Sequence, residues 1–171
     1  MTVKSVEAIV AALNAAGARY LIVDGLAVVA HGFVRFTSDV DLVLDPDPGS
    51  LGRALDALAR LGYRPRAPVE ITAFADPMKR AAWMRDKGLV VFSLYSPDHA
   101  ATEVDLFVEE PFDFATAYGH AVRFEVAPGL PATFIARADL IAMKRRAGRP
   151  VDLDDARVLE SLGTLPDPED S

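Results

Sequence analysis

Hydrophobic residues recur along this chain with two different periods, which predict a mixture of helices and strands. Within residues 5–16, apolar side chains stand at helical spacing, which predicts an amphipathic helix that covers a sheet. Short apolar runs bounded by turn residues predict strands instead. These runs are 20–23, 39–44, 69–74, 89–95, 102–108, 120–126 and 132–135.

Capping residues predict further helices between the strands, because glycine, proline or an acidic residue marks their ends. These helices are 26–31, 50–61, 77–87, 112–118, a segment around Leu140 that ends at Gly148, and a segment that Asp152 caps. We expect the strands 89–95 and 102–108 to form an antiparallel hairpin. The predicted fold class is therefore α+β, with a mixed sheet of about five strands and helices packed on it.

The totals of the sequence indicate one domain. Its 171 residues, 51% of them hydrophobic, suffice for one core, so we expect a single domain at 1–163 and a disordered tail at 164–171. The absence of cysteine excludes disulfides and thiolate metal sites, and it favours the cytoplasm. No apolar run approaches membrane-spanning length, so we expect a soluble protein without a membrane partner.

The net charge argues against general binding to nucleic acid. A formal charge of −7 does not provide the basic surface that phosphate backbones require. Basic clusters do occur at Arg64 and Arg66, at 79–87 and at 144–149. Each of them is typical of a solvated surface, although a local nucleic-acid contact stays open.

The most informative polar residues are Asp39 and Asp41, which stand one residue apart inside an apolar run. Because side chains alternate along a strand, both carboxylates project from one face, with Cα atoms roughly 7 Å apart. Two like charges held so close favour a divalent cation such as Mg²⁺ between them. A polar, solvent-facing strand surface is the alternative, and a motif this short does not decide between the two.

The residues before this pair indicate an anion site. Residues 20–23 predict a buried strand, Asp24-Gly25 a turn, and the following residues a short helix that Gly32 ends. Backbone N–H groups at the start of such a helix favour an anion such as a triphosphate. The anion would face the two carboxylates.

Together these motifs resemble the nucleotidyltransferases of the DNA polymerase beta superfamily. The similarity is greatest to the small bacterial AbiEii-like branch of abortive-infection toxins, with its glycine pair, an alanine, His-Gly, and Arg-x-Thr-x-Asp-x-Asp. The matching residues are Gly25, Ala27, His31, Gly32, Arg35, Thr37, Asp39 and Asp41. Asp24 stands where the first glycine of the pair usually stands, and an acidic side chain beside a phosphate site is electrostatically unfavourable.

A second motif near the C-terminal end resembles the same branch. It consists of Leu-Ile-Ala-x-Lys ending at Lys144, then Ala-Gly-Arg-Pro, then Asp-Leu-x-Asp ending at Asp155. Without that context, Lys144 is typical of a lysine with a buried stem and Asp155 of an acid in the first turn of a helix. The resemblance spans residues 18–162.

The resemblance implies a two-metal site. Asp39 and Asp41 would bind Mg²⁺, or Mn²⁺ in its place, and Asp105 from a neighbouring strand would be the third ligand and accept a proton from the acceptor. Glu103 shares a strand face with Asp105 and is the alternative third ligand.

The resemblance also implies a nucleotide site. Lys144 and Arg35 would neutralise the phosphates, Gly25 would let the backbone approach them, and Thr37 belongs to the same nucleotide-binding motif. Asp155 would orient Lys144 or the acceptor.

The expected activity is transfer of a nucleoside monophosphate group from a nucleoside triphosphate, such as ATP, to a hydroxyl acceptor, with release of pyrophosphate. The acceptor is open between tRNA, as for toxin-like relatives, and a small molecule or a protein side chain. A toxin would imply an antitoxin partner. Two other classes stay open: a catalytically silent module that binds a nucleotide or a partner protein, and a plain metal-binding or structural domain.

Overall fold

The protein is described here by a computed structural model in which residues 1–163 are placed; the predicted tail at 164–171 lies outside them. Strands from the whole length of that part form one mixed seven-stranded sheet in the order β3-β4-β5-β2-β1-β7-β6. The strands are β1 (Tyr20–Val23), β2 (Asp39–Leu44), β3 (Arg64–Pro65), β4 (Val91–Tyr95), β5 (Glu103–Phe107), β6 (Val122–Ala127) and β7 (Leu130–Phe134).

The α+β class is confirmed, but the expected number of about five strands is wrong. Strand β3 has two residues, too few for any periodic pattern, and it joins the sheet only by antiparallel pairing with β4. The predicted run 120–126 corresponds to β6, an edge strand whose middle residues 123–125 are all exposed. Six of the predicted apolar runs form strands, so the expected number was too low, and backbone pairing adds β3 as the seventh strand.

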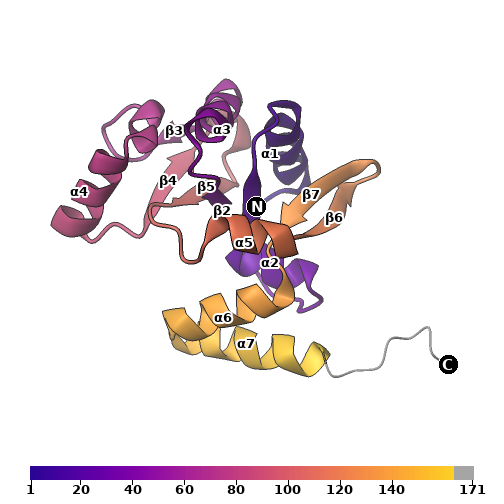
Figure 1. Cartoon of the computed structure of the whole chain (residues 1–171). Coiled ribbons are helices and arrows are strands. Elements are labelled where there is room, and N and C mark those ends of the chain that lie inside the picture. The colour runs from indigo at the N-terminus through magenta and orange to yellow at the C-terminus, as the bar shows by residue number, and fades with distance from the viewer. Residues whose placement is uncertain (164–171) are drawn as a thin grey trace.

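Seven α-helices and two short 3₁₀ helices surround the sheet in the described part of the chain. They are α1 (Val3–Ala15), α2 (Asp24–Ala30), α3 (Pro48–Arg60), η1 (Ile71–Ala75), α4 (Pro77–Lys87), η2 (Pro97–His99), α5 (Phe114–His120), α6 (Arg137–Ala147) and α7 (Pro150–Leu162). In Figure 1, α1 and α3 lie above the sheet, and α6 and α7 lie side by side below α2. None of these helices is long and apolar enough to cross a membrane.

The local sequence signals predicted the positions of most elements, but some predicted boundaries differ from those in the structure. Residues 69–74 do not form the predicted strand: residues 71–75 form η1 instead, in which only Phe74 is buried. The dipeptide Asp24-Gly25 is the first turn of α2 rather than a separate turn. Asp152 lies inside α7, whose N-cap is Arg149, so the prediction that Asp152 caps this helix is wrong.

The two central strands hold the chemistry in place. Strand β2 pairs antiparallel with β1 and parallel with β5, and Val40 and Leu42 on one of its faces are fully buried. Close packing of such side chains leaves a strand little freedom to shift along its neighbours. The opposite face of β2, which carries Asp39 and Asp41, is therefore fixed by the core beneath it.

Candidate active site

The carboxylates that the sequence singled out meet at the edge of one cleft. In the parallel register of β2 and β5, Asp41 lies directly opposite Asp105, and Asp39 lies opposite Glu103. Neighbouring strands are about 4.8 Å apart, so the first pair stands side by side. Asp39, Asp41 and Asp105 all line a cleft of about 700 Å³.

Glu103 takes a different role from Asp105, although the two share a strand face. Its carboxylate accepts hydrogen bonds from the Arg66 guanidinium, with Arg66 Nε 3.0 Å from Glu103 Oε2. This bond to a cation lowers the pKa of Glu103. Glu103 is not among the residues that line the cleft, so Asp105 is the acid of β5 that faces it.

The carboxylates in the cleft repel one another. Burial, together with the charges of Asp24, Asp105 and Asp39, raises the pKa of Asp41 to about 8. Burial also raises the pKa of Asp105, with the Asp39 charge adding and a hydrogen bond from Ser93 opposing. The protein itself therefore leaves this group of acids short of positive charge.

These residues fit a divalent cation. Asp105 Oδ1 is buried and has no hydrogen-bond partner among the described residues. A buried, unpartnered carboxylate oxygen beside a second acid is costly unless a cation balances it. Oxygen-only donors of this kind suit Mg²⁺ or Mn²⁺.

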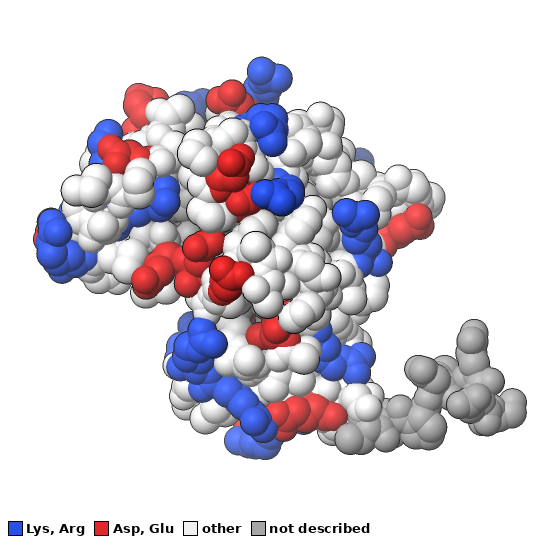
Figure 2. All heavy atoms as spheres, in the orientation of Figure 1, with Lys and Arg blue, Asp and Glu red and all other residues white. Residues whose placement is uncertain are grey.

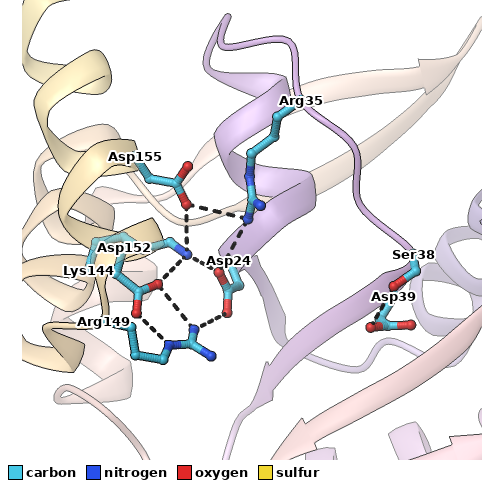
Figure 3. A network of polar contacts seen from close by, with 8 residues as sticks. All are labelled: Asp24, Arg35, Ser38, Asp39, Lys144, Arg149, Asp152 and Asp155. Atoms are coloured by element: carbon cyan, nitrogen blue, oxygen red, sulfur yellow. Dashed lines mark hydrogen bonds and ion pairs between the residues drawn. The ribbon is translucent and has the colours of Figure 1, made fainter.

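Lys144 lies beside this cleft, buried among three other carboxylates (Figure 3). Its side chain is 2% exposed, and its ammonium contacts Asp24 and lies 2.9 Å from Asp152 Oδ1 and 3.1 Å from Asp155 Oδ2. Burial alone would lower the pKa of Lys144, but the hydrogen bonds to these carboxylates outweigh it and raise the pKa. Lys144 is thus held as a buried cation.

The same three carboxylates form a compact acidic triad. Oxygens of Asp24, Asp152 and Asp155 lie within 4.8 Å of one another, a separation that a metal ion can bridge. The Lys144 ammonium already contacts each of them, so the triad has a cation of its own. Among the acids that line the cleft, Asp39, Asp41 and Asp105 are consequently the ones with uncompensated charge.

Two arginines complete the network around Lys144. Arg35 Nη2 lies 3.4 Å from Asp155 Oδ2 and 3.8 Å from Asp24 Oδ1. Arg149 Nε lies 2.6 Å from Asp152 Oδ2, and Arg149 Nη2 lies 3.8 Å from Asp24 Oδ2. Both arginines line the cleft, and the Arg149 side chain is 63% exposed.

Neither Arg149 nor Asp152 was predicted to belong to the site, although both lie within the C-terminal motif and Asp152 was expected to cap a helix. Arg149 follows Gly148, which ends α6 in a left-handed conformation, and it precedes Pro150 at the start of α7. The sequence did contain a signal for Arg149: a long basic side chain stands between a glycine that ends one helix and a proline that begins the next.

Gly25 allows the segment after α2 to approach that helix closely. A Cβ atom there would lie 2.5 Å from Thr37 Oγ1 and 3.1 Å from Arg35 Nη2, both too close. The predicted nucleotide-site residues Gly25, Arg35 and Thr37 all line the cleft. The absence of a side chain at Gly25 therefore allows Arg35 and Thr37 to take their positions. This packing role is separate from the predicted approach of the Gly25 backbone to the phosphates.

Comparisons with known proteins give a fold but no family. No family model matches the sequence, and no curated protein matches it. The solution structure of the antibiotic-resistance factor ANT(2″)-Ia matches with a TM-score of 0.58 at 18% identity, over 93% of this chain and 82% of that one. The crystal structure of ANT(2″)-Ia in complex with adenylyl-2″-tobramycin matches with a TM-score of 0.55 at 16% identity, over 94% and 92%.

The chain therefore has the nucleotidyltransferase-like fold that the sequence predicted. At these identities the likeness carries the fold and no more. The AbiEii-like branch and the roles of individual residues stay predictions.

Proposed function

We propose that this protein is a metal-dependent nucleotidyltransferase that moves a nucleoside monophosphate group from a nucleoside triphosphate to a hydroxyl acceptor. One observation carries the proposal: Asp41 and Asp105 stand opposite each other in a cleft, short of positive charge, next to a network with exposed arginine. Such an arrangement suits a metal–triphosphate complex, in which the cations satisfy the acids and the arginine satisfies the phosphates.

Asp39, Asp41 and Asp105 would hold the divalent cations. Bound cations supply Lewis acidity, which polarises the α-phosphate and makes the acceptor hydroxyl more acidic. Asp105, which presents an unpartnered Oδ1 in the cleft, would accept the proton of that hydroxyl. The acceptor oxygen forms a bond to the α-phosphorus, the bond from that phosphorus to the bridging oxygen breaks, and pyrophosphate leaves.

The cations on the other side of the cleft would bind the phosphates. Arg149 is the most available of them, because it is largely exposed and its second contact, with Asp24, is long. The Arg35 side chain is only 25% exposed, and Lys144 is enclosed by its three acids. Lys144 and Asp155 therefore hold the network together through their ion pair, and Arg149 contacts the ligand.

We propose a small molecule as the acceptor. The cleft of about 700 Å³ is within the range of small-molecule sites, which is about 300–1,000 Å³. Its rim carries Phe36, Val90 and Val151, and Phe36 is 85% exposed, which provides an apolar platform for a ring system. ANT(2″)-Ia, which has the same fold, is crystallised with an adenylylated antibiotic.

A tRNA acceptor is the second candidate, and it would bring the toxin role and an antitoxin partner with it. Basic side chains gather over the lower-left end of the molecule in Figure 2, where Figure 1 places α6 and α7. The last turn of α6 contributes Arg145 and Arg146 beside Lys144. A local basic surface next to the cleft is where a polynucleotide end would bind.

The test supplies each of the four α-labelled triphosphates with Mg²⁺ or Mn²⁺ to a cell extract separated into RNA, protein and small molecules. The Asp39→Ala/Asp41→Ala variant is the negative control, and Asp154→Asn on the exposed face of α7 is the matched control. Label in one fraction with wild type and Asp154→Asn alone supports the proposal and names the acceptor class. Nucleotide-dependent thermal stabilisation without label in any fraction would contradict transfer and indicate a silent binding module.

A further inference from the structure

Asp24 has a backbone conformation that its residue type rarely adopts. Its φ angle is +52°, and it is the one residue other than glycine with positive φ within residues 1–163. Non-glycine residues remain in this left-handed region when their surroundings enforce it, and aspartate tolerates it better than most. We therefore expect the contacts of its side chain to hold Asp24 in this conformation.

The Asp24 carboxylate contacts cations from three separate segments. It touches the Lys144 ammonium from α6, and it lies 3.8 Å from Arg35, in the segment before β2, and 3.8 Å from Arg149 between α6 and α7. Figure 3 shows these groups converging on Asp24, whereas Asp39 points elsewhere. Asp24 also lines the cleft itself, unlike Asp155.

The network is balanced in charge only when Asp24 is included. Three carboxylates, those of Asp24, Asp152 and Asp155, face the three cations Lys144, Arg35 and Arg149. Without Asp24 the network carries one net positive charge toward the cleft. The Asp24 charge also adds to the repulsion that Asp41 experiences across the cleft.

We propose that the Asp24 carboxylate competes with the anionic substrate for the cationic groups of the cleft. Because Asp24 already lies beside these groups, it selects for highly charged ligands. An anion that binds Arg149 or Arg35 competes with the nearby Asp24 carboxylate for the positive charge of these side chains. An anion with a single phosphate offers little more charge than the carboxylate with which it competes, and a triphosphate offers several times more. Asp24 is thus a specificity-determining residue.

This inference rests on the proposed function for the nature of the anion, and its test does not require catalysis. Inorganic tripolyphosphate is titrated calorimetrically, with EDTA present, into wild type, Asp24→Asn and Asp24→Gly. Asparagine keeps the shape of the side chain and tolerates positive φ, so it removes only the charge. Glycine removes the charge and the backbone strain, and it serves where the asparagine variant does not fold. Asp154→Asn controls for the change in net charge.

We expect Asp24→Asn and Asp24→Gly to bind tripolyphosphate at least about tenfold more tightly than wild type, which corresponds to about 1.4 kcal/mol. Asp154→Asn is expected to bind like wild type. Equal or weaker binding by the Asp24 variants, or no binding by any variant, would overturn the inference. Tighter binding combined with no nucleotidyl transfer would sink the proposed function and leave the role of Asp24 intact.

Discussion

Asp41 on β2 and Asp105 on β5 lie directly opposite each other in the parallel register of the two central strands. Local spacing placed Asp41 beside Asp39, and the sheet adds Asp105 from 64 positions further along the chain. Both groups have a raised pKa, for which burial is the first cause and neighbouring acids the second. The core under β2 thus holds acids together that would separate in an unfolded chain.

The stability of the metal-free protein is expected to depend on pH through Asp41. Its pKa is about 8 in the folded state and near 3.8 in an unfolded chain, so the folded protein binds the proton more tightly. The contribution of this group is therefore fully present below about pH 4 and is lost as the pH rises through about 8. Chemical denaturation of wild type and Asp41→Asn in EDTA, from pH 5 to 9, measures this.

As the pH rises across that range, we expect wild type to lose unfolding free energy relative to Asp41→Asn, because only wild type ionises at this position. Saturating Mg²⁺ should reduce the difference, because the cation compensates the ionised carboxylate of wild type. A difference that stays constant with pH in EDTA would contradict the uncompensated charge at Asp41.

The carboxylates on β5 are expected to differ in metal binding. Asp105→Asn removes the negative charge and replaces one carboxylate oxygen with an amide nitrogen, so it should weaken Mn²⁺ binding about 10-fold to 100-fold. Glu103→Gln should leave Mn²⁺ binding unchanged, because Glu103 pairs with Arg66 outside the cleft. Electron paramagnetic resonance of free Mn²⁺ measures both, and a larger loss for Glu103→Gln would reverse the assignment.

A side chain at Gly25 is expected to displace the segment that carries Arg35 and Thr37. In Gly25→Ala the new Cβ would meet Thr37 Oγ1 at 2.5 Å, which forces Thr37 and Arg35 away from α2. We expect a loss of about 1–3 kcal/mol in unfolding free energy, typical of overpacking, together with weaker triphosphate binding.

Gly52→Ala is the matched control, because nothing lies within 4 Å of a Cβ at that position in α3. Alanine there should stabilise the protein by about 0.5–1 kcal/mol. Equal stability changes at both glycines, measured by urea denaturation, would show that Gly25 has no packing role.

Removing the Lys144 ammonium is expected to destabilise the fold. Lys144→Met leaves Asp152 and Asp155 buried with one cation fewer, and breaking a buried ion pair in this way costs about 3–5 kcal/mol. Lys4→Met on the exposed face of α1 is the control and should change the unfolding free energy by less than about 0.5 kcal/mol. A similarly small loss at Lys144 would mean that the network contributes nothing to stability.

The sequence alone predicted the parts of the site that depend on local geometry. The two-residue period of a strand put Asp39 and Asp41 on one face. The apolar runs around them indicated central strands, and the buried residues of β1 and β2 agree. The resemblance supplied Asp105 and Lys144, and the structure places both at the cleft.

The sequence could not show which charges pair with each other. Lys144 meets Asp24 across 120 positions of the chain, a contact that depends on how α6 packs against α2. Taken alone, Asp24 looked like an obstacle to phosphate binding, because the cations around it come from distant segments. The short β3 and the 3₁₀ helix η1 were also missed, since neither follows a hydrophobic period.

The most direct test of the central claim compares nucleotidyl transfer by wild type, Asp41→Asn and Asp154→Asn, with the triphosphate and acceptor identified by labelling. Pyrophosphate release and label transfer are measured together at saturating Mg²⁺, and circular dichroism confirms that each variant is folded. We predict that Asp41→Asn loses at least about 10³-fold in rate, at the scale of losing essential transition-state stabilisation, whereas Asp154→Asn equals wild type. Normal turnover in folded Asp41→Asn would contradict the assignment of these carboxylates to a catalytic metal site.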